Sequence, residues 1–181
     1  MTEAAAPVVP PLRVVLMGVS GCGKSTVGEG LSARLGWHFV EGDSLHPPEN
    51  VAKMSAGQPL GDQDRAGWLD ALSVELASAR STEQGLVVSC SAHKRSDRDR
   101  LRAGDPHVLF VHLAGSRECI AQRLAARTHL YMPPTLLASQ FADLQPPEAD
   151  EQALCLDVEQ TPAQLMAAIV QHLQTQTCST P

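Results

Sequence analysis

Residues 18–25 read Gly-Val-Ser-Gly-Cys-Gly-Lys-Ser and fill every fixed position of the phosphate-binding P-loop pattern. In this pattern, backbone N–H groups converge on phosphate oxygens, Lys24 neutralises charge on the terminal phosphoryl group, and the Ser25 hydroxyl can bind Mg²⁺. The apolar run 12–17 before the motif predicts a buried strand, and the stretch after it favours a helix as far as Leu35. Because strand, loop and helix stand in this order, the motif predicts a nucleoside triphosphate site rather than a chance match.

The motif also predicts which residues bind ATP. They are Gly18, Ser20, Gly21, Cys22, Gly23, Lys24, Ser25 and Thr26. Lys24 is in addition a candidate catalytic residue, because it would follow the phosphoryl group as it moves.

Length and composition indicate one globular domain. At 181 residues the chain can form one sizeable core, and its 43% hydrophobic and 19% charged residues are ordinary for such a protein. We expect a single domain over residues 12–174, with a flexible leader over 1–11 and a frayed tail over 175–181. The leader lacks the parts of a secretion signal, and no apolar run approaches the roughly 20 residues that cross a bilayer.

Charge and cysteine content narrow the partners and the compartment. The net charge of −6 argues against an extended surface for nucleic acid. The five cysteines are odd in number and lack the paired spacing of a zinc site, which favours reduced thiols in the cytoplasm. We therefore expect a cytoplasmic protein that binds neither nucleic acid nor membrane.

Apolar runs alternate with longer stretches of helical spacing, which indicates an α/β fold. The runs lie at 12–17, 38–41, 86–91, 107–113 and 153–157. Because they are continuously apolar, both faces of the sheet should be covered, which predicts three layers: a five-stranded parallel sheet with helices on both faces. In the last helix, one apolar stripe should pack into the core; it comprises Leu165, Met166, Ile169, Val170 and Leu173. Ligands of such sheets bind beyond the carboxyl ends of the strands.

Two carboxylates and a histidine follow the second expected strand, at the sheet edge that carries the P-loop. Asp43 can accept a hydroxyl proton during phosphoryl transfer, and Glu41 can hold Mg²⁺ through water. The alternative is that Asp43 and Ser44 only cap the following turn and that His46 is a surface residue before two prolines.

The third expected strand is followed by Cys90 and Ser91, with no acid of the kind that holds Mg²⁺ in many P-loop enzymes. Ser25, water and the pair of Glu41 and Asp43 should then support the ion. Cys90 should be buried and inert. The run 94–102 alternates basic residues with two aspartates, which by itself indicates a solvated helix face with local ion pairs.

A longer pattern identifies a family resemblance. Beyond the P-loop with Met17 and Thr26, it comprises residues 42–47, Asn50, 53–54, Gly57, 59–60, Asp62, 64–65, 68–69, 90–92, 94–95, 98–99, 101–102, 123–124, Arg127, 132–133, 139–141 and 150–151. Together these residues resemble the gluconokinase family and cover nearly the whole expected domain. The block 42–69 is the most specific part, because many enzymes share a P-loop.

The resemblance implies phosphorylation of D-gluconate by ATP to 6-phospho-D-gluconate, on a P-loop NTPase fold like that of nucleoside monophosphate kinases and shikimate kinase. It also suggests a homodimer. Gluconate carries one carboxylate and several hydroxyls, so its pocket needs a cation and polar groups. The residues assigned to it are Asp43, His46, Lys53, Arg65 and Lys94. For Arg65, which follows two acids, a surface ion pair of little energetic value stays open as the alternative.

Arg123 and Arg127 lie one helical turn apart, before the irregular segment 128–133. They resemble the lid arginines of small kinases, so we expect a lid over 123–141, with Arg123 near adenine and Arg127 as a catalytic residue near the phosphates. The alternative is a basic helix end that interacts with the helix dipole. The backbone of residues 157–162, after the last expected strand, should contact adenine.

Four features depart from the family pattern. Glu41 replaces an Asp, His93 replaces a Leu, Asp97 replaces a Tyr, and the lid segment Thr-His-Leu-Tyr at 128–131 lacks the usual hinge glycine. We expect the protein to be active, with lid closure or substrate preference open to change by these departures. Two other functions stay open from the residues: a kinase of another small hydroxy acid such as shikimate or of a nucleoside monophosphate, and a nucleotide-binding protein with weakened catalysis.

Overall fold

The structure is a computed structural model that describes residues 9–126 and 134–177. Its strands are β1 (Arg13–Met17), β2 (His38–Glu41), β3 (Leu86–Ser89), β4 (Leu109–Ala114) and β5 (Leu154–Asp157). Its α-helices are α1 (Lys24–Leu35), α2 (Pro48–Ser55), α3 (Asp62–Ser81), α4 (Arg95–Gly104), α5 (Arg117–Ala125), α6 (Pro134–Asp143) and α7 (Pro162–Thr177). Two short 3₁₀ helices, η1 (Gly42–Leu45) and η2 (Ala149–Glu151), complete the described elements.

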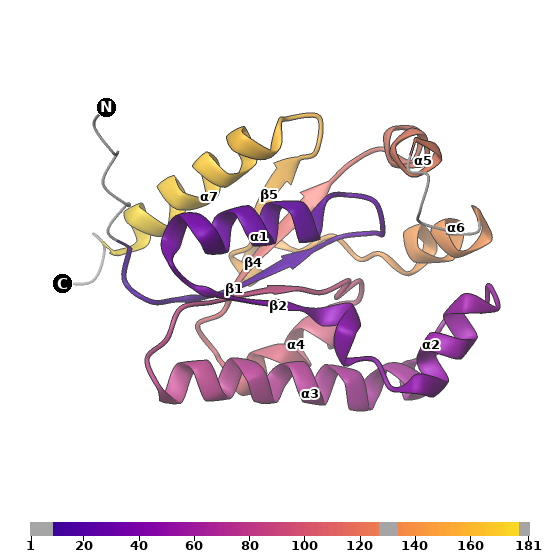
Figure 1. The fold of residues 1–181 in the computed structure, drawn as a ribbon, viewed down its shortest axis with the longest axis horizontal. Helices are drawn as coiled ribbons and strands as arrows, with labels where there is room; N and C mark the ends of the chain where they lie inside the picture. The colour runs from indigo at the N-terminus through magenta and orange to yellow at the C-terminus, as the bar shows by residue number, and fades with distance from the viewer. Residues whose placement is uncertain (1–8, 127–133, 178–181) are drawn as a thin grey trace.

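The five strands form one sheet in the order β2-β3-β1-β4-β5, and every neighbouring pair is parallel. Helices α1 and α7 cover one face of this sheet, and α3 and α4 cover the other (Figure 1). The structure thus confirms the three-layer α/β fold that the continuous apolar runs predict. In the middle of the sheet, β1 has β3 on one side and β4 on the other, so the loop after β1 lies where ligands of such sheets bind.

Aliphatic side chains make up most of both cores. Val14 and Leu16 of β1 pack with α1 and α7 on one face, whereas Val15 and Met17 pack with α3 and α4 on the other. The stripe predicted for α7 is confirmed, because Leu165, Ile169, Val170 and Leu173 are buried and Met166 packs against them.

The strand bounds differ from the prediction by two residues at two places and by a single residue at the others where they differ. Strand β3 ends at Ser89 rather than at Ser91, and Ala92, three residues later, takes a left-handed backbone conformation with a φ of 35°. Strand β4 begins at Leu109 rather than at His107, because Asp105 organises a turn before it, accepting hydrogen bonds from the backbone of His107 and Val108.

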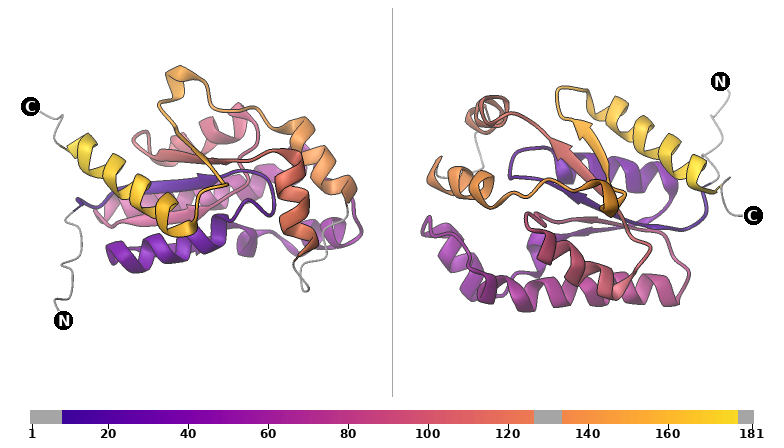
Figure 2. Two further views of the ribbon diagram at one scale, coloured as in Figure 1. Left: turned by 90° about the horizontal axis from the view of Figure 1, so that it is seen from above. Right: turned by 180° about the vertical axis from the view of Figure 1, so that it is seen from behind.

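Helices α2, α5 and α6 gather at the end of the sheet toward which the strands point (Figure 2). This end therefore has both the strand termini and three helices from distant parts of the sequence around it. Among the described residues, no helix has the length and the apolar character needed to pass through a membrane.

Candidate active site

The P-loop connects β1 to α1, and its glycines allow a conformation that other residues rarely adopt. Gly18, Gly21 and Gly23 have φ values of 142°, 86° and 100°. Helix α1 begins at Lys24, whose Nζ donates hydrogen bonds to the carbonyls of Gly18 at 3.0 Å and Val19 at 3.1 Å. The ammonium group therefore folds over its own loop, where it can exchange carbonyl oxygens for phosphate oxygens.

A cavity of about 280 Å³ lies on the P-loop, and we call it the phosphate cavity. It is lined by Ser20, Gly21, Gly23, Lys24, Ser25, Thr26, Glu41 and Asp43. Of the residues predicted to bind ATP from the motif, Gly18 and Cys22 do not line it. The Cys22 side chain packs in the core, and its backbone N–H donates to the carbonyl of Val19.

A second cavity, also of about 280 Å³, lies beside the first, and we call it the acceptor cavity. Its polar lining comprises Ser20, Lys24, Asp43, His46, Ser55, Arg65, Ser91, His93, Ser139, Gln140 and Asp143, and Val51, Met54, Pro59, Leu60 and Leu136 complete it. The lining therefore combines a lysine, an arginine, two carboxylates and several hydroxyls, which suits a small polar anion.

Lys24 and Asp43 line both cavities. A phosphate held on the P-loop and a hydroxyl held in the acceptor cavity would therefore meet between these two side chains. The Asp43 side chain is 68% exposed and lies in η1, directly after β2. Its Oδ1 lies 4.0 Å from Nε2 of His46, and η1 has no side-chain cap hydrogen bond within the described residues, so a capping role for Asp43 finds no support.

His46 is not a surface residue, because its side chain is only 4% exposed. Its ring stacks on Trp68 with the centroids 4.1 Å apart, and its Nδ1 lies 3.3 Å from Nδ2 of Asn50. Burial lowers the pKa of His46, the nearby Asp43 carboxylate opposes this, and Arg65 adds to it. The ring is therefore mostly neutral at pH 7 and presents a polar edge to the acceptor cavity.

Glu41 and Ser25 bring oxygen atoms to the phosphate cavity. The Ser89 hydroxyl donates a hydrogen bond to Oε1 of Glu41, which fixes this carboxylate at the end of β2. No group of three or more His, Cys, Asp or Glu side chains in the described part of the chain could hold a metal ion by itself. The residues therefore fit a Mg²⁺ that takes most of its ligands from phosphate oxygens and water, which is the usual shell of this ion.

Arg65 comes from the first turn of α3 and reaches the wall of the acceptor cavity. Its Nη2 lies 2.8 Å from Oδ2 of Asp97, and it also donates to the Ser91 hydroxyl at 3.4 Å. The two ion-pair partners are only 12% and 8% exposed, so the pair is not the weak surface salt bridge that the sequence left open.

The structure does not bring Lys53 and Lys94 to the acceptor cavity. Nζ of Lys53 lies 2.6 Å from Asp64, and Nζ of Lys94 lies 2.6 Å from Asp62. Lys94 lines a separate, shallower hollow between the start of α3 and α6. Asp43, His46 and Arg65 are thus the predicted substrate residues that lie together.

Arg123 lies in the last turn of α5 and donates a hydrogen bond to the carbonyl of Val158, just after β5. It therefore touches the segment 157–162 that we expect to contact adenine, although it lines neither cavity. Arg127 and the lid segment 128–131 lie outside the described residues.

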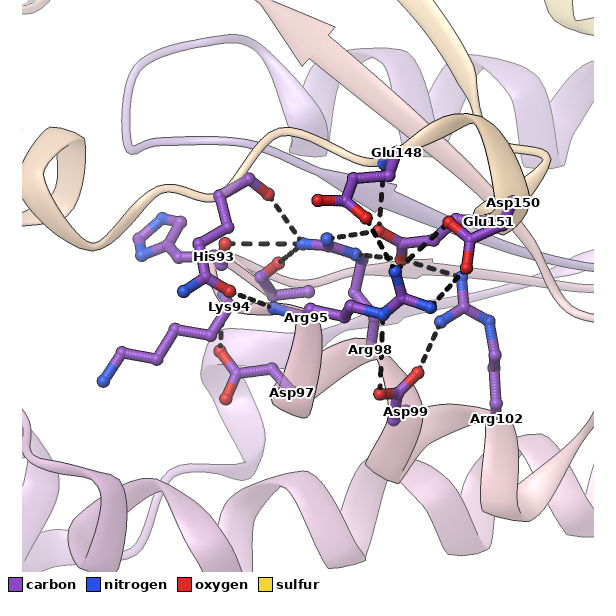
Figure 3. Close-up of polar contacts among 12 residues, drawn as sticks. His93, Lys94, Arg95, Asp97, Arg98, Asp99, Arg102, Glu148, Asp150 and Glu151 are labelled. Carbon is purple, nitrogen blue, oxygen red and sulfur yellow. Dashed lines mark hydrogen bonds and ion pairs between the residues drawn. The ribbon is translucent and has the colours of Figure 1, made fainter.

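Helix α4 has the local surface ion pairs that its alternating charges indicate, between Asp99 and both Arg95 and Arg102, but not all of its charges are solvated. Arg98 is fully buried, and its guanidinium forms two hydrogen bonds, of 2.6 and 2.7 Å, with the carboxylate of Glu151 in η2. Arg95 pairs with Glu148 and Asp150, and Arg102 also reaches Glu151 (Figure 3). The prediction of a solvated face was wrong for Arg98, because periodicity along one helix cannot show acids that another segment brings to it. Cys90, as predicted, is fully buried, and burial raises its pKa to about 12.

Sequence reasoning missed several residues that line the acceptor cavity. Helix α6 contributes Gln140, whose Oε1 accepts a hydrogen bond of 2.8 Å from the Ser20 backbone and whose Nε2 lies 3.2 Å from the Ser20 hydroxyl. Ser91 and His93 enter from the segment after β3. The position of Ser91 and His93 beyond a strand end was a usable signal, whereas the approach of α6 depends on tertiary packing.

Comparison with known proteins agrees with this geometry. The family model described as shikimate kinase matches residues 20–174. A gluconokinase of Gluconobacter oxydans (strain 621H) is 47% identical over 164 residues, which is 91% of this chain and 92% of that protein. The chain belongs to the gluconokinase family.

Solved structures extend the similarity to gluconokinases and sugar kinases. A gluconokinase from Sinorhizobium meliloti 1021 is 43% identical, with a TM-score of 0.82 and coverage of 93% of this chain and 99% of that one. A sugar kinase from Janibacter sp. HTCC2649 is 42% identical, with a TM-score of 0.87 and coverage of 91% and 95%. The resemblance to gluconokinases seen in the sequence is thus confirmed over nearly the whole chain.

Proposed function

We propose that this protein transfers the γ-phosphoryl group of ATP to D-gluconate and releases ADP and 6-phospho-D-gluconate. The observation that carries the proposal is that Lys24 and Asp43 line both the phosphate cavity and the acceptor cavity. The gluconokinases among the relatives support the choice of gluconate over shikimate, although the matching family model bears the name of shikimate kinase.

In this reaction, Asp43 accepts the proton of the C6 hydroxyl as the hydroxyl oxygen attacks the γ-phosphorus. The bond between the γ-phosphorus and the bridging oxygen breaks, and the electron pair stays on ADP. Lys24 accompanies the phosphoryl group from donor to acceptor and neutralises its charge. The carboxylate of gluconate is held by Arg65, which lines the acceptor cavity together with Asp43 and thereby orients the chain of hydroxyls.

Mg²⁺ supplies charge neutralisation of the β- and γ-phosphates when it is bound. The Ser25 hydroxyl and, through water, Glu41 would hold it, since both line the phosphate cavity. Arg123 would lie near adenine, and Arg127 would contribute a further positive charge near the phosphates. A cytoplasmic location and a homodimer complete the proposal; the four cysteines that the structure describes are free thiols, which suits a reducing compartment.

The test is an assay of ADP release that depends on D-gluconate, with Mg-ATP in excess. We expect turnover with D-gluconate, much slower turnover with shikimate or a nucleoside monophosphate, and none in the variant Lys24→Ala. Faster turnover with shikimate or with a nucleotide would refute the assignment of the substrate. Tight ATP binding without turnover of any of these acceptors would refute the proposal that the protein is a kinase.

A further inference from the structure

His93 is a buried polar residue that the proposed reaction does not use. It lies directly after Ala92, in the segment between β3 and α4, and it lines the acceptor cavity while being only 2% exposed. Its Nε2 is buried and has no hydrogen-bond partner within residues 9–126 and 134–177. Buried polar atoms in native proteins are nearly always paired, so an unpaired one in a side chain that lines a cavity indicates a partner that arrives with a ligand.

The backbone around His93 is held in an unfavourable conformation. Ala92 has a φ of 35°, which residues other than glycine rarely adopt and which persists only where the surroundings impose it. The buried Arg98 donates to the carbonyls of Ala92 at 3.2 Å and of His93 at 3.4 Å, and the backbone N–H of Gln145 donates to the His93 carbonyl at 2.8 Å. These hydrogen bonds hold the backbone of Ala92 and His93 in its unfavourable conformation and thereby fix the direction of the His93 side chain.

Figure 3 shows the His93 ring turned away from the ion pairs of α4 and η2 that hold its backbone. The side chain lines the acceptor cavity, and Gly18 and Lys24 of the P-loop act on its ring. The charged groups that act on it are Arg65 and Lys24, which flank the cavity, and the backbone of Gly18 and the His112 ring also lie near it. Burial and these two cations lower the pKa of His93 to about 3, so the ring is neutral at pH 7.

We propose that Nε2 of His93 hydrogen-bonds a hydroxyl group of the sugar acid in the acceptor cavity and helps to select an acceptor with a hydroxyl at that position. A hydroxyl fits because it both donates and accepts, so it pairs with a neutral imidazole in either tautomer. The carboxylate of the sugar acid is bound by Arg65 instead, because the neutral His93 ring carries no positive charge to pair with it. This inference rests on the proposed function and adds a substrate-binding residue at a position where the family pattern has a leucine.

The test compares wild type with His93→Leu, which fills similar space without polar atoms, and with His93→Gln, which retains a donor and an acceptor. In His93→Leu we expect the KM for D-gluconate to rise about fivefold to tenfold, while the KM for ATP stays within about twofold. His93→Gln should restore most of the loss. His38→Leu, an exposed histidine at the start of β2, is the matched control and should leave both constants unchanged.

Two further readouts separate substrate binding from a structural role. Because His93→Leu removes an unpaired buried polar atom, the ligand-free variant should melt at a higher temperature than wild type, whereas loss of a structural contact would lower it. Gluconate analogues that each lack one hydroxyl should reveal one position whose loss weakens turnover in wild type but not in His93→Leu.

Equal penalties for every analogue in both proteins, together with an unchanged KM in His93→Leu, would overturn the inference. If His93→Leu does not fold, a wild-type KM in a folded His93→Ala would overturn it, and an increase that His93→Gln reverses would support it. Absence of gluconate turnover in wild type would instead refute the proposed function, so the two failures are distinguishable.

Discussion

Arg65 and Asp97 form an ion pair at the wall of the acceptor cavity, with Nη2 of Arg65 2.8 Å from Oδ2 of Asp97. Asp97 stands where the family pattern has a tyrosine, so it introduces a countercharge next to the guanidinium. Within the described part of the chain, Nε of Arg65 is buried without a hydrogen-bond partner. Arg65 is thus held in place by Asp97 and retains donor capacity for the carboxylate of a substrate.

Replacement of Asp97 by Asn should lower the folding stability and increase the stabilisation that bound D-gluconate provides. Asp97→Asn leaves Arg65 mostly buried without its counterion, which should cost about 1–3 kcal/mol of folding stability. A bound gluconate carboxylate supplies the missing charge, so D-gluconate should raise the melting temperature more in the variant than in wild type. Thermal unfolding with and without D-gluconate measures this difference.

The control for this experiment is Asp99→Asn, whose side chain is 57% exposed and pairs with Arg95 and Arg102 on the surface of α4. It should change neither the stability nor the effect of the ligand by a large amount. An equal gain from D-gluconate in wild type and Asp97→Asn would show that Arg65 does not bind the carboxylate.

Asp43→Asn should separate chemistry from nucleotide binding. The amide keeps the shape of the side chain but cannot accept the hydroxyl proton, so kcat should fall about 10²–10⁴-fold while ATP affinity changes by less than about twofold. Steady-state kinetics and calorimetric titration with ATP measure the two quantities. Ser44→Ala is the control next in the chain, because among the described residues its hydroxyl bonds only to the Glu41 carbonyl. A comparable loss in both variants would argue against a base at Asp43.

Glu151 should stabilise the protein in a pH-dependent manner. Its hydrogen bonds with Arg98, which outweigh the opposing effect of burial, lower its pKa to about 2. A carboxylate with a lowered folded-state pKa contributes stability that is complete above its ordinary pKa and is lost as the pH falls toward 2. Removal of one partner of a buried ion pair costs about 3–5 kcal/mol, so Glu151→Gln should be less stable by about this amount at pH 7.

The difference in unfolding free energy between wild type and Glu151→Gln should therefore be largest above about pH 5 and should narrow at lower pH. Urea denaturation at pH 7, 5 and 4 measures it. Glu148→Gln, with a side chain that is 73% exposed, is the control and should remain close to wild type. A difference that stays constant with pH would contradict the role of the Glu151 charge.

Much of the fold and the phosphate cavity could be predicted from the sequence, because both depend on local patterns. The P-loop specifies its own backbone conformation, and continuously apolar strands imply a sheet covered on both faces. Asp43 could be placed because strand ends of a parallel sheet meet at one edge.

The acceptor cavity could be predicted only in part, because long-range packing decides which side chains reach it. Lys53 and Lys94 have the right chemistry, but two aspartates in the first turn of α3 pair with them outside the cavity. Arg98 has the sequence context of a solvated charge, but it is buried and forms an ion pair with Glu151, 53 positions away. His93 departs from the family pattern, but the sequence does not show that its side chain lines the acceptor cavity. That position depends on the left-handed backbone conformation of Ala92.

Gly42 should be indispensable because two strands and a helix meet around it. A Cβ added there would lie 2.0 Å from the backbone carbonyl oxygen of Ser89, and the Gly42 backbone bonds to the Ser89 hydroxyl and to Nε1 of Trp68. Gly42→Ala must therefore push η1 away from β3, which moves the adjacent Asp43 and should cost about 1–3 kcal/mol or more together with a large part of kcat.

Gly67 offers the matched comparison, because it lies in the middle of α3 and an added Cβ would meet nothing within 4 Å. Gly67→Ala should raise the free energy of unfolding by about 0.5–1 kcal/mol, since alanine favours the helix, and should leave kcat unchanged. Chemical denaturation and the ADP-release assay on both variants measure the contrast. A Gly42→Ala variant with the melting temperature and kcat of wild type would mean that the contact between η1 and β3 does not position Asp43.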